Sequence, residues 1–214
     1  MKEQIKRSEN LKKKLNLHLN RLVNSKDKDY YSSIHTDDLI NLKMLLSDIN
    51  NILTLKLTEA AIQWLSKYFD LSNVEKESLL SETDKINPNS NGFDIKMEST
   101  LKILAEVKCN VPASEGNRYM AAQRNSILDD ALKLINGKGS LEDPTDYYKF
   151  IFLLNLGEKS DEAINALLTE RNTRSANPLR INRNNVVKKM VLLTDEKPES
   201  LNKQSVYLVS IVIQ

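Results

Sequence analysis

The stretch "NGFDIKMESTLKILAEVKCN" (residues 91–110) decides the fold, because its apolar side chains recur mainly at every second position. A period of two is the spacing of a β-strand whose side chains alternate between two faces. The pattern runs over residues 92–97 and 101–108, with Glu98, Ser99 and Thr100 between the two runs. Two such runs joined by a short connection predict a β-hairpin, in which residue 94 faces residue 104.

Acidic and basic side chains fall together on one face of this hairpin. Asp94, Glu106 and Lys108 all occupy even positions, so they should point to the same side. In the predicted register Asp94 and Glu106 are diagonal neighbours, with Cβ atoms about 7 Å apart. The opposite face should anchor the hairpin to a core through Phe93, Ile95, Ile103 and Val107.

Two neighbouring carboxylates repel each other unless a cation lies between them. Mg²⁺ suits such a pair, because it prefers oxygen ligands and keeps waters for a substrate phosphate. Asp94 and Glu106 are therefore the predicted metal ligands, and Lys108 could orient the attacking water or add positive charge. This is the chemistry of phosphodiester hydrolysis.

The tripeptide acid-x-Lys carries no weight by itself, since about three matches are expected by chance at this composition. One alternative takes Asp84 as the first acid, followed by Asp94 and Lys96. Another interprets Glu106 and Lys108 as an ordinary ion pair on an exposed hairpin edge. The three matches are Asp94–Lys96, Glu106–Lys108 and Asp195–Lys197.

The rest of the chain predicts an α/β core behind a helical N-terminal region. Helical spacing indicates helices over 3–24, from Asp37 or Asp38, from Thr58, over 73–82, over 117–136 and over 161–171. Apolar runs indicate strands over 147–156, 186–194 and 206–214. Gly137 is placed to end the helix before the first of these strands.

The composition is that of an ordinary globular protein, with 214 residues, 40% hydrophobic and 28% charged. A single cysteine excludes an internal disulfide, and no signal peptide or membrane span is evident. We therefore expect an intracellular protein. The net charge of +2 hides a segregation: residues 1–28 and 171–189 carry +6 each, so the remainder carries −10. Basic segments around an acidic middle are consistent with a polyanion binder that has a metal site, whereas the alternative for residues 1–28 is a Lys-rich helix face that is simply solvated.

The motif "GFD…ILAEVKCN" resembles the PD-(D/E)xK nuclease superfamily, with Asp94 as the first acid and Glu106-x-Lys108 as the second half. The resemblance covers about residues 57–156 and departs from the pattern at Phe93, which replaces a proline. It implies a restriction-endonuclease-like fold with an α-β-β-β-α-β core, a mixed central sheet flanked by helices. We expect this core over 57–214 and a helical region for dimerisation or DNA clamping over 1–56.

The resemblance also implies an activity, namely Mg²⁺-dependent cleavage of double-stranded DNA, usually by a homodimer. We expect a type II restriction enzyme, for which a cognate DNA methyltransferase would act on the same site. Many members add an acid from the preceding helix, and Glu59 is the candidate here, although an acid near a helix N-terminus is also favoured by the helix dipole alone. Gln123 is a further catalytic candidate, since it could touch Lys108 or the scissile phosphate; the alternative is an ordinary amide on the helix surface.

Candidate DNA-binding residues lie in two places. Those after the catalytic strand are Asn110, Ser114, Glu115, Asn117 and Arg118, although such residues are also normal loop content. Those in the Arg- and Asn-rich segment 171–189, predicted to be a loop broken by Pro178, are Arg174, Arg180 and Arg183.

Three other functional classes remain open at the level of the sequence. Another nuclease with the same core, such as a resolvase, a repair nuclease or a phage-defence nuclease, would differ in the shape of its substrate. A non-catalytic DNA-binding module would bind DNA with a steep salt dependence and never cut. A helical interaction protein would show no effect of Mg²⁺.

Overall fold

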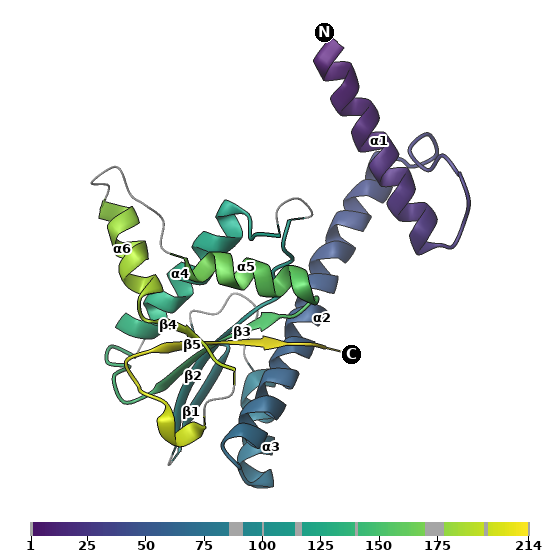
Figure 1. Cartoon of the computed structure of the whole chain (residues 1–214). Helices are drawn as coiled ribbons and strands as arrows, with labels where there is room; N and C mark the ends of the chain where they lie inside the picture. The colour runs from purple at the N-terminus through teal and green to yellow at the C-terminus, as the bar shows by residue number, and fades with distance from the viewer. Residues whose placement is uncertain are drawn as a thin grey trace. The chain divides into compact units, whose positions relative to one another are not determined.

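A computed structural model gives the fold of the chain (Figure 1). It describes residues 2–85, 92–99, 101–113, 117–139, 141–169, 178–194 and 197–213, with backbone alone at 2–6, 178–182 and 198. The chain divides into two compact units, Met1–Ile49 and Asn50–Gln214. Within the described ranges no helix is both long and apolar enough to cross a membrane.

The first unit contains α1 (Lys2–Leu22) and the beginning of α2 (Thr36–Tyr68), which confirms the first two predicted helices. The segment between them is held by Asn16, whose Nδ2 donates to Asp29 Oδ1 over 2.7 Å and whose Oδ1 accepts from Tyr31 N over 2.9 Å. No side chain in residues 7–49 is buried. The hydrophobic core of the protein therefore lies in the second unit.

The prediction of a separate helix beginning at Thr58 is wrong, because α2 runs on without a break to Tyr68. Neither glycine nor proline interrupts the helix, and the Thr58 hydroxyl donates to Thr54 O within it over 2.8 Å. The next helix, α3 (Asn73–Asp84), matches the one predicted over 73–82. A capping box, in which Ser72 and Glu75 satisfy each other's backbone N–H, fixes its start.

A five-stranded, mostly parallel sheet forms the centre of the second unit, which is a mixed α/β fold. Its strand order is β1-β2-β3-β5-β4, and only the β1–β2 pair is antiparallel. The strands are β1 (Ile95–Glu98), β2 (Lys102–Lys108), β3 (Tyr148–Leu154), β4 (Met190–Leu192) and β5 (Val206–Ile211). The predicted hairpin and the strands over 147–156 and 206–214 are thus confirmed.

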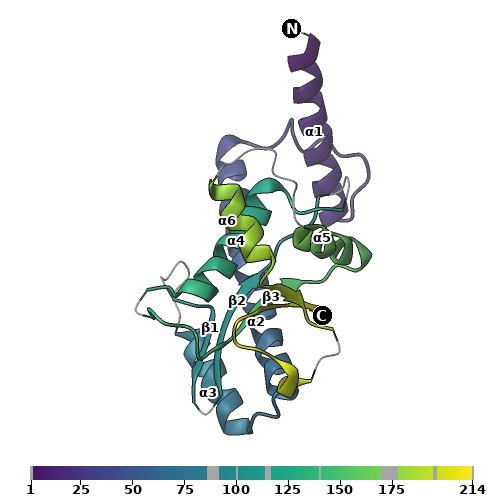
Figure 2. The same cartoon turned by 60° about the vertical axis from the view of Figure 1, so that its left-hand side comes forward.

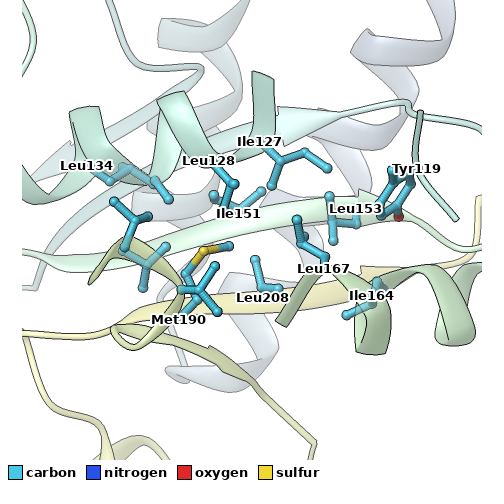
Figure 3. Packing of buried hydrophobic residues seen from close by; sticks show 14 of the residues in the cluster. Tyr119, Ile127, Leu128, Leu134, Ile151, Leu153, Ile164, Leu167, Met190 and Leu208 are labelled. Carbon is cyan, nitrogen blue, oxygen red and sulfur yellow. The ribbon is translucent and has the colours of Figure 1, made fainter. Parts of the chain in front are cut away.

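Helices cover both faces of the sheet, as two views of the ribbon show (Figures 1 and 2). On one face an apolar cluster joins the sheet to α4 (Ala121–Asn136), α5 (Glu158–Leu168) and α6 (Pro178–Val187) (Figure 3). On the other face a second cluster joins it to α2 and α3, with Trp64 stacked on Tyr68 at its border. Apolar residues bury the sheet from both sides, as the continuous apolar run of β3 requires.

The register of the hairpin differs from the prediction by two residues, since Lys96 faces Leu104 and Ile95 faces Ala105. The connection is 99–101 rather than 98–100, because Glu98 still pairs with Lys102. Asp94 therefore lies beside Glu106 and Val107 rather than diagonally across from Glu106.

The expected anchoring of Phe93 beside Ile95, Ile103 and Val107 is also wrong. Phe93 packs in the cluster under α4, whereas the other three lie in the cluster under α2 and α3. The reason is local: Phe93 precedes β1, so the strand's alternation does not extend to it.

The prediction of a loop over 171–189 is wrong for residues 178–187, which form α6. Pro178 starts this helix instead of breaking it, because the first backbone N–H groups of a helix have no intrahelical partner to lose. Val186 and Val187 then pack into the core, so the strand predicted over 186–194 is reduced to Met190–Leu192. Residues 171–177 lie outside the described ranges.

One feature departs from the core that the family resemblance implies. Within the described residues two strands, β1 and β2, precede α4, whereas the α-β-β-β-α-β core has three. The order from α3 to β3 is thus α-β-β-α-β. The helix after the motif and the parallel strand after that helix are both present.

Candidate active site

An open pocket of about 790 Å³ lies where the hairpin meets α2 and α3 within the second unit. Its wall includes the end of β2 and the residues after it, from Glu106 to Asn110. Asp94 and Lys138 reach it from the segments before β1 and after α4. Asp84, the acid of the alternative motif, also lines it. The pocket thus gathers Asp94, Glu106 and Lys108, as the sequence predicted.

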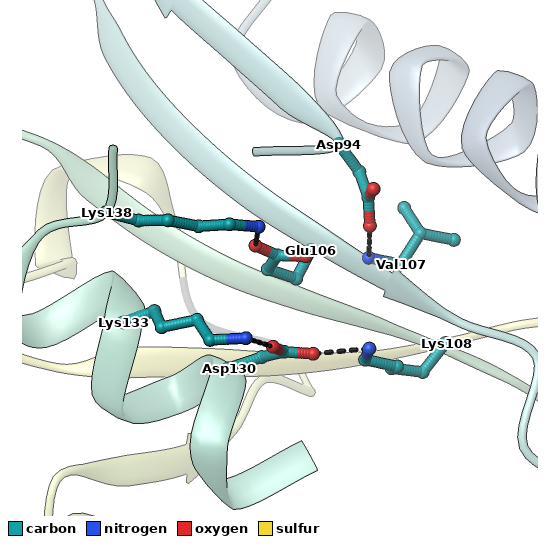
Figure 4. A network of polar contacts seen from close by, with 7 residues as sticks. All are labelled: Asp94, Glu106, Val107, Lys108, Asp130, Lys133 and Lys138. Carbon is teal, nitrogen blue, oxygen red and sulfur yellow. Dashed lines mark hydrogen bonds and ion pairs between the residues drawn. The ribbon is translucent and has the colours of Figure 1, made fainter. Parts of the chain in front are cut away.

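Asp94 is fixed against the second strand of the hairpin. Its Oδ2 accepts a hydrogen bond from Val107 N over 2.7 Å (Figure 4). Asp94 lies just before β1, which begins at Ile95, so its side chain and not its backbone makes this bond to β2. The carboxylate is consequently held next to Glu106 without being neutralised by that contact.

Glu106 is a buried acid, only 3% exposed, in a strand that lies between β1 and β3. Its Oε1 accepts from Lys138 Nζ over 3.1 Å. Burial raises the pKa of Glu106 to about 8, with the charges of Asp94 and Asp130 adding to the rise and Lys138 opposing it. The alternative of an exposed Glu106–Lys108 pair is therefore wrong: β2 is internal, and Lys138 is the lysine on Glu106.

Lys138 owes its place to the turn after α4. Gly137 ends the helix at φ +94°, and an added Cβ there would lie 2.3 Å from Leu141 O. Backbone hydrogen bonds of 3.0 and 3.2 Å then join Lys138 and Leu141. The Lys138 ammonium also lies 5.6 Å from the centre of the Phe93 ring.

Lys108 points from β2 to α4, where it forms an ion pair with Asp130 (Figure 4). Asp130 is 4% exposed, and its other oxygen accepts from Lys133 over 2.8 Å. Two lysines thus neutralise one buried acid. Asp130 stands on the stripe of α4 that also buries Ile127 and Leu134.

Sequence reasoning missed Asp130 and Lys138, although each carried a signal. An acid on the apolar stripe of a predicted helix needs a buried cation as its partner. Asp130 is such an acid, because it lies on the same stripe as Ile127 and Leu134. Lys138 directly follows the glycine that was predicted to end its helix. Neither signal identifies the partner of the residue, because the Lys108–Asp130 and Glu106–Lys138 pairs each join residues more than 20 positions apart.

The residues present fit a hard divalent cation. Asp94 and Glu106 open on the same pocket, and the Asp94 charge adds to the rise in the pKa of Glu106 that burial causes. In the described part of the chain no group of three or more His, Cys, Asp and Glu side chains is placed to bind a metal. Two carboxylates with waters completing the shell are the arrangement that Mg²⁺ accepts.

The other two predicted catalytic residues do not reach this pocket. Gln123 is engaged at the start of α4, where its Oε1 accepts from Met120 N over 3.0 Å and its Nε2 donates to Val111 O over 3.0 Å. Glu59 is exposed on α2 and is not part of the pocket wall, although the adjacent Thr58 is.

The predicted DNA-binding residues are spread over several places. Asn110 lines the pocket, and its buried Nδ2 has no hydrogen-bond partner among the described residues. Asn117 donates to Glu162 over 2.8 Å, and Arg118 borders a separate cavity of about 170 Å³. Arg183 is half-buried on α6, and Arg180 lies on the same helix. Ser114, Glu115 and Arg174 lie outside the described residues.

Comparison with known proteins gives no relative: no family model, no curated protein and no solved structure matches the chain.

Proposed function

We propose that the chain is a Mg²⁺-dependent endonuclease that hydrolyses phosphodiester bonds of double-stranded DNA, as a type II restriction enzyme does. One observation carries the proposal: Asp94 and Glu106 open on a single large pocket that two lysines also line. Oxygen ligands beside ammonium groups suit a metal-bound phosphate.

Each side chain has a defined task in this proposal. Asp94 and Glu106 would hold Mg²⁺, which when bound would stabilise the charge that grows on the phosphodiester and lower the pKa of a bound water. The backbone N–H of Val107 keeps the Asp94 carboxylate turned toward β2. Asp130 keeps the Lys108 ammonium at the wall of the pocket, from which it would position the attacking water.

Binding of DNA would use several further groups. The unpartnered Asn110 amide is a donor at the wall of the pocket, and Arg118 is exposed on the segment that leads into α4. The basic segments 1–28 and 171–189 would contact phosphates. We further propose a homodimer, a cytoplasmic bacterial setting and a cognate methyltransferase, as expected for restriction.

A second candidate is a non-catalytic DNA-binding module. It is favoured by the ion pairs, since lysines contact both Glu106 and Asp130 directly. Such a module would bind DNA with an affinity that falls steeply with salt, and no divalent cation would be required.

The test is incubation of purified protein with plasmid, phage and branched DNA in Mg²⁺, against EDTA. We expect cleavage that is lost with EDTA and in Lys108→Ala, but kept in Lys102→Ala, which removes an exposed lysine from the same strand. Cutting of branched DNA alone would favour a resolvase. DNA binding without cutting of any substrate would contradict the proposal and favour the binding module.

A further inference from the structure

The lysine on Glu106 is not the lysine of the motif, and its position suggests a role. Lys138 Nζ lies 3.1 Å from Glu106 Oε1, and the two side chains are only 15% and 4% exposed. A metal ion shared by Asp94 and Glu106 would have to approach the same carboxylate. The ammonium of Lys138 and a metal ion would therefore compete for the buried Glu106 carboxylate, and each would weaken the binding of the other.

We propose that Lys138 is a resident counter-cation of the metal site, which holds Glu106 in the metal-free protein and leaves it when a divalent cation binds. This inference rests on the proposed function, because it assumes that Asp94 and Glu106 bind a metal. It adds a residue that neither the motif nor its spacing names.

The local structure allows this exchange without movement of the backbone. Gly137 and the paired backbone groups of Lys138 and Leu141 fix the turn, so the flexible side chain alone has to move. Lys138 itself lines the open pocket, where its released ammonium would stay in water and near the substrate phosphate.

Lys133 provides a matched comparison within the same network. It pairs with Asp130 over 2.8 Å and is not part of the pocket wall. Its removal deletes the same charge but leaves the Glu106–Lys138 contact intact. A difference between the two variants therefore separates the direct contact from the general effect of lost positive charge.

The experiment is calorimetric titration of the full chain with Mg²⁺ alone, at about pH 9. This pH lies above the pKa of about 8 of Glu106, so that protons compete less for the carboxylate. We expect Lys138→Met to bind Mg²⁺ about tenfold more tightly than the wild type, because a competing cation next to the ligand is gone. Lys133→Met should change the affinity less than about threefold, and Lys138→Arg should stay near the wild type.

The outcomes separate this inference from the proposed function. If the wild type binds Mg²⁺ but Lys138→Met binds it no more tightly than Lys133→Met does, the inference fails and the metal site stands. If the wild type binds none, or if Asp94→Asn and Glu106→Gln bind it as the wild type does, the inference fails together with the proposed metal site.

A second readout uses the unaltered protein and guards against a variant that fails to fold. In lysine labelled with ¹⁵N at Nζ, Mg²⁺ should move the Lys138 ammonium resonance and leave that of Lys133 in place. Lys138→Arg and Lys133→Arg assign the two signals. A Lys138 resonance that does not move while Mg²⁺ binds would overturn the exchange.

Discussion

Glu106 and Asp130 are both buried acids that pair with lysines, yet their surroundings differ in charge. Asp130 has a lysine on each of its two oxygens, Lys108 and Lys133. Glu106 has one lysine, and the negative charge of Asp94 acts on it as well. The first acid has a partner for each oxygen and holds α4 to β2, whereas the second is short of positive charge.

The largest expected effect is on the satisfied acid. Asp130→Ala leaves Lys108 and Lys133 without their shared partner, and breaking such a buried pair should lower the free energy of unfolding by about 3 kcal/mol. The neighbouring Asp129→Ala, at an exposed position, should change it by less than about 0.5 kcal/mol. Urea unfolding of both variants makes the comparison, and equal stabilities would refute the structural role of Asp130.

A smaller effect is expected at the turn that presents Lys138 to Glu106. Gly137→Ala would place a Cβ 2.3 Å from Leu141 O at a positive φ, so the turn must shift, and we expect a loss of about 2 kcal/mol. Gly157→Ala also has a positive φ but meets no atom within 4 Å, so it should lose only about 1 kcal/mol. Thermal unfolding of the two variants separates the effect of the steric clash from that of backbone strain. A larger loss of stability in Gly157→Ala than in Gly137→Ala would contradict this explanation.

A pH-dependent effect is expected at Glu106, the acid that is short of positive charge. Between pH 4.5 and about 8 the folded Glu106 keeps a proton that the unfolded chain releases, because burial raises its pKa. This group therefore makes the wild type less stable as pH rises through that window. Glu106→Gln removes this effect, so at about pH 8 the variant should be more stable than the wild type.

The control is the same comparison of the wild type with Glu106→Gln near pH 4.5. Glu106 is protonated in the folded protein at this pH, so the two proteins should have similar stabilities. Unfolding in urea at both pH values gives the two differences. A Glu106→Gln variant that loses stability at pH 8 relative to the wild type would show that Lys138 fully neutralises the acid.

The sequence predicted the hairpin and the common face of Glu106 and Lys108, because alternation along a strand depends only on local spacing. Asp94 reaches the same pocket from the segment before β1, where the alternation of the strand does not apply. The sequence did not predict the register, since a hairpin connection can begin one residue later and still close. It did not predict α6 either, because proline is common both in loops and in the first turn of a helix, and Pro178 alone does not distinguish the two.

The partners of the site residues could not be predicted for a different reason. Lys138 and Glu106 are 32 residues apart, and Lys108 and Asp130 are 22 apart, so only the packing of α4 against the sheet brings them together. The alternative to the motif was an ion pair between Glu106 and Lys108. In the structure these two neighbours on β2 turn to different partners.

The most direct test of the central claim, that Asp94 and Glu106 form a metal-dependent nuclease site, is cleavage of phage DNA in Mg²⁺ by four proteins. We predict discrete fragments with the wild type and with Asp129→Asn, and intact DNA with Asp94→Asn and Glu106→Gln, provided all four remain folded by circular dichroism. Fragments from Asp94→Asn or Glu106→Gln that match those of the wild type would contradict the claim.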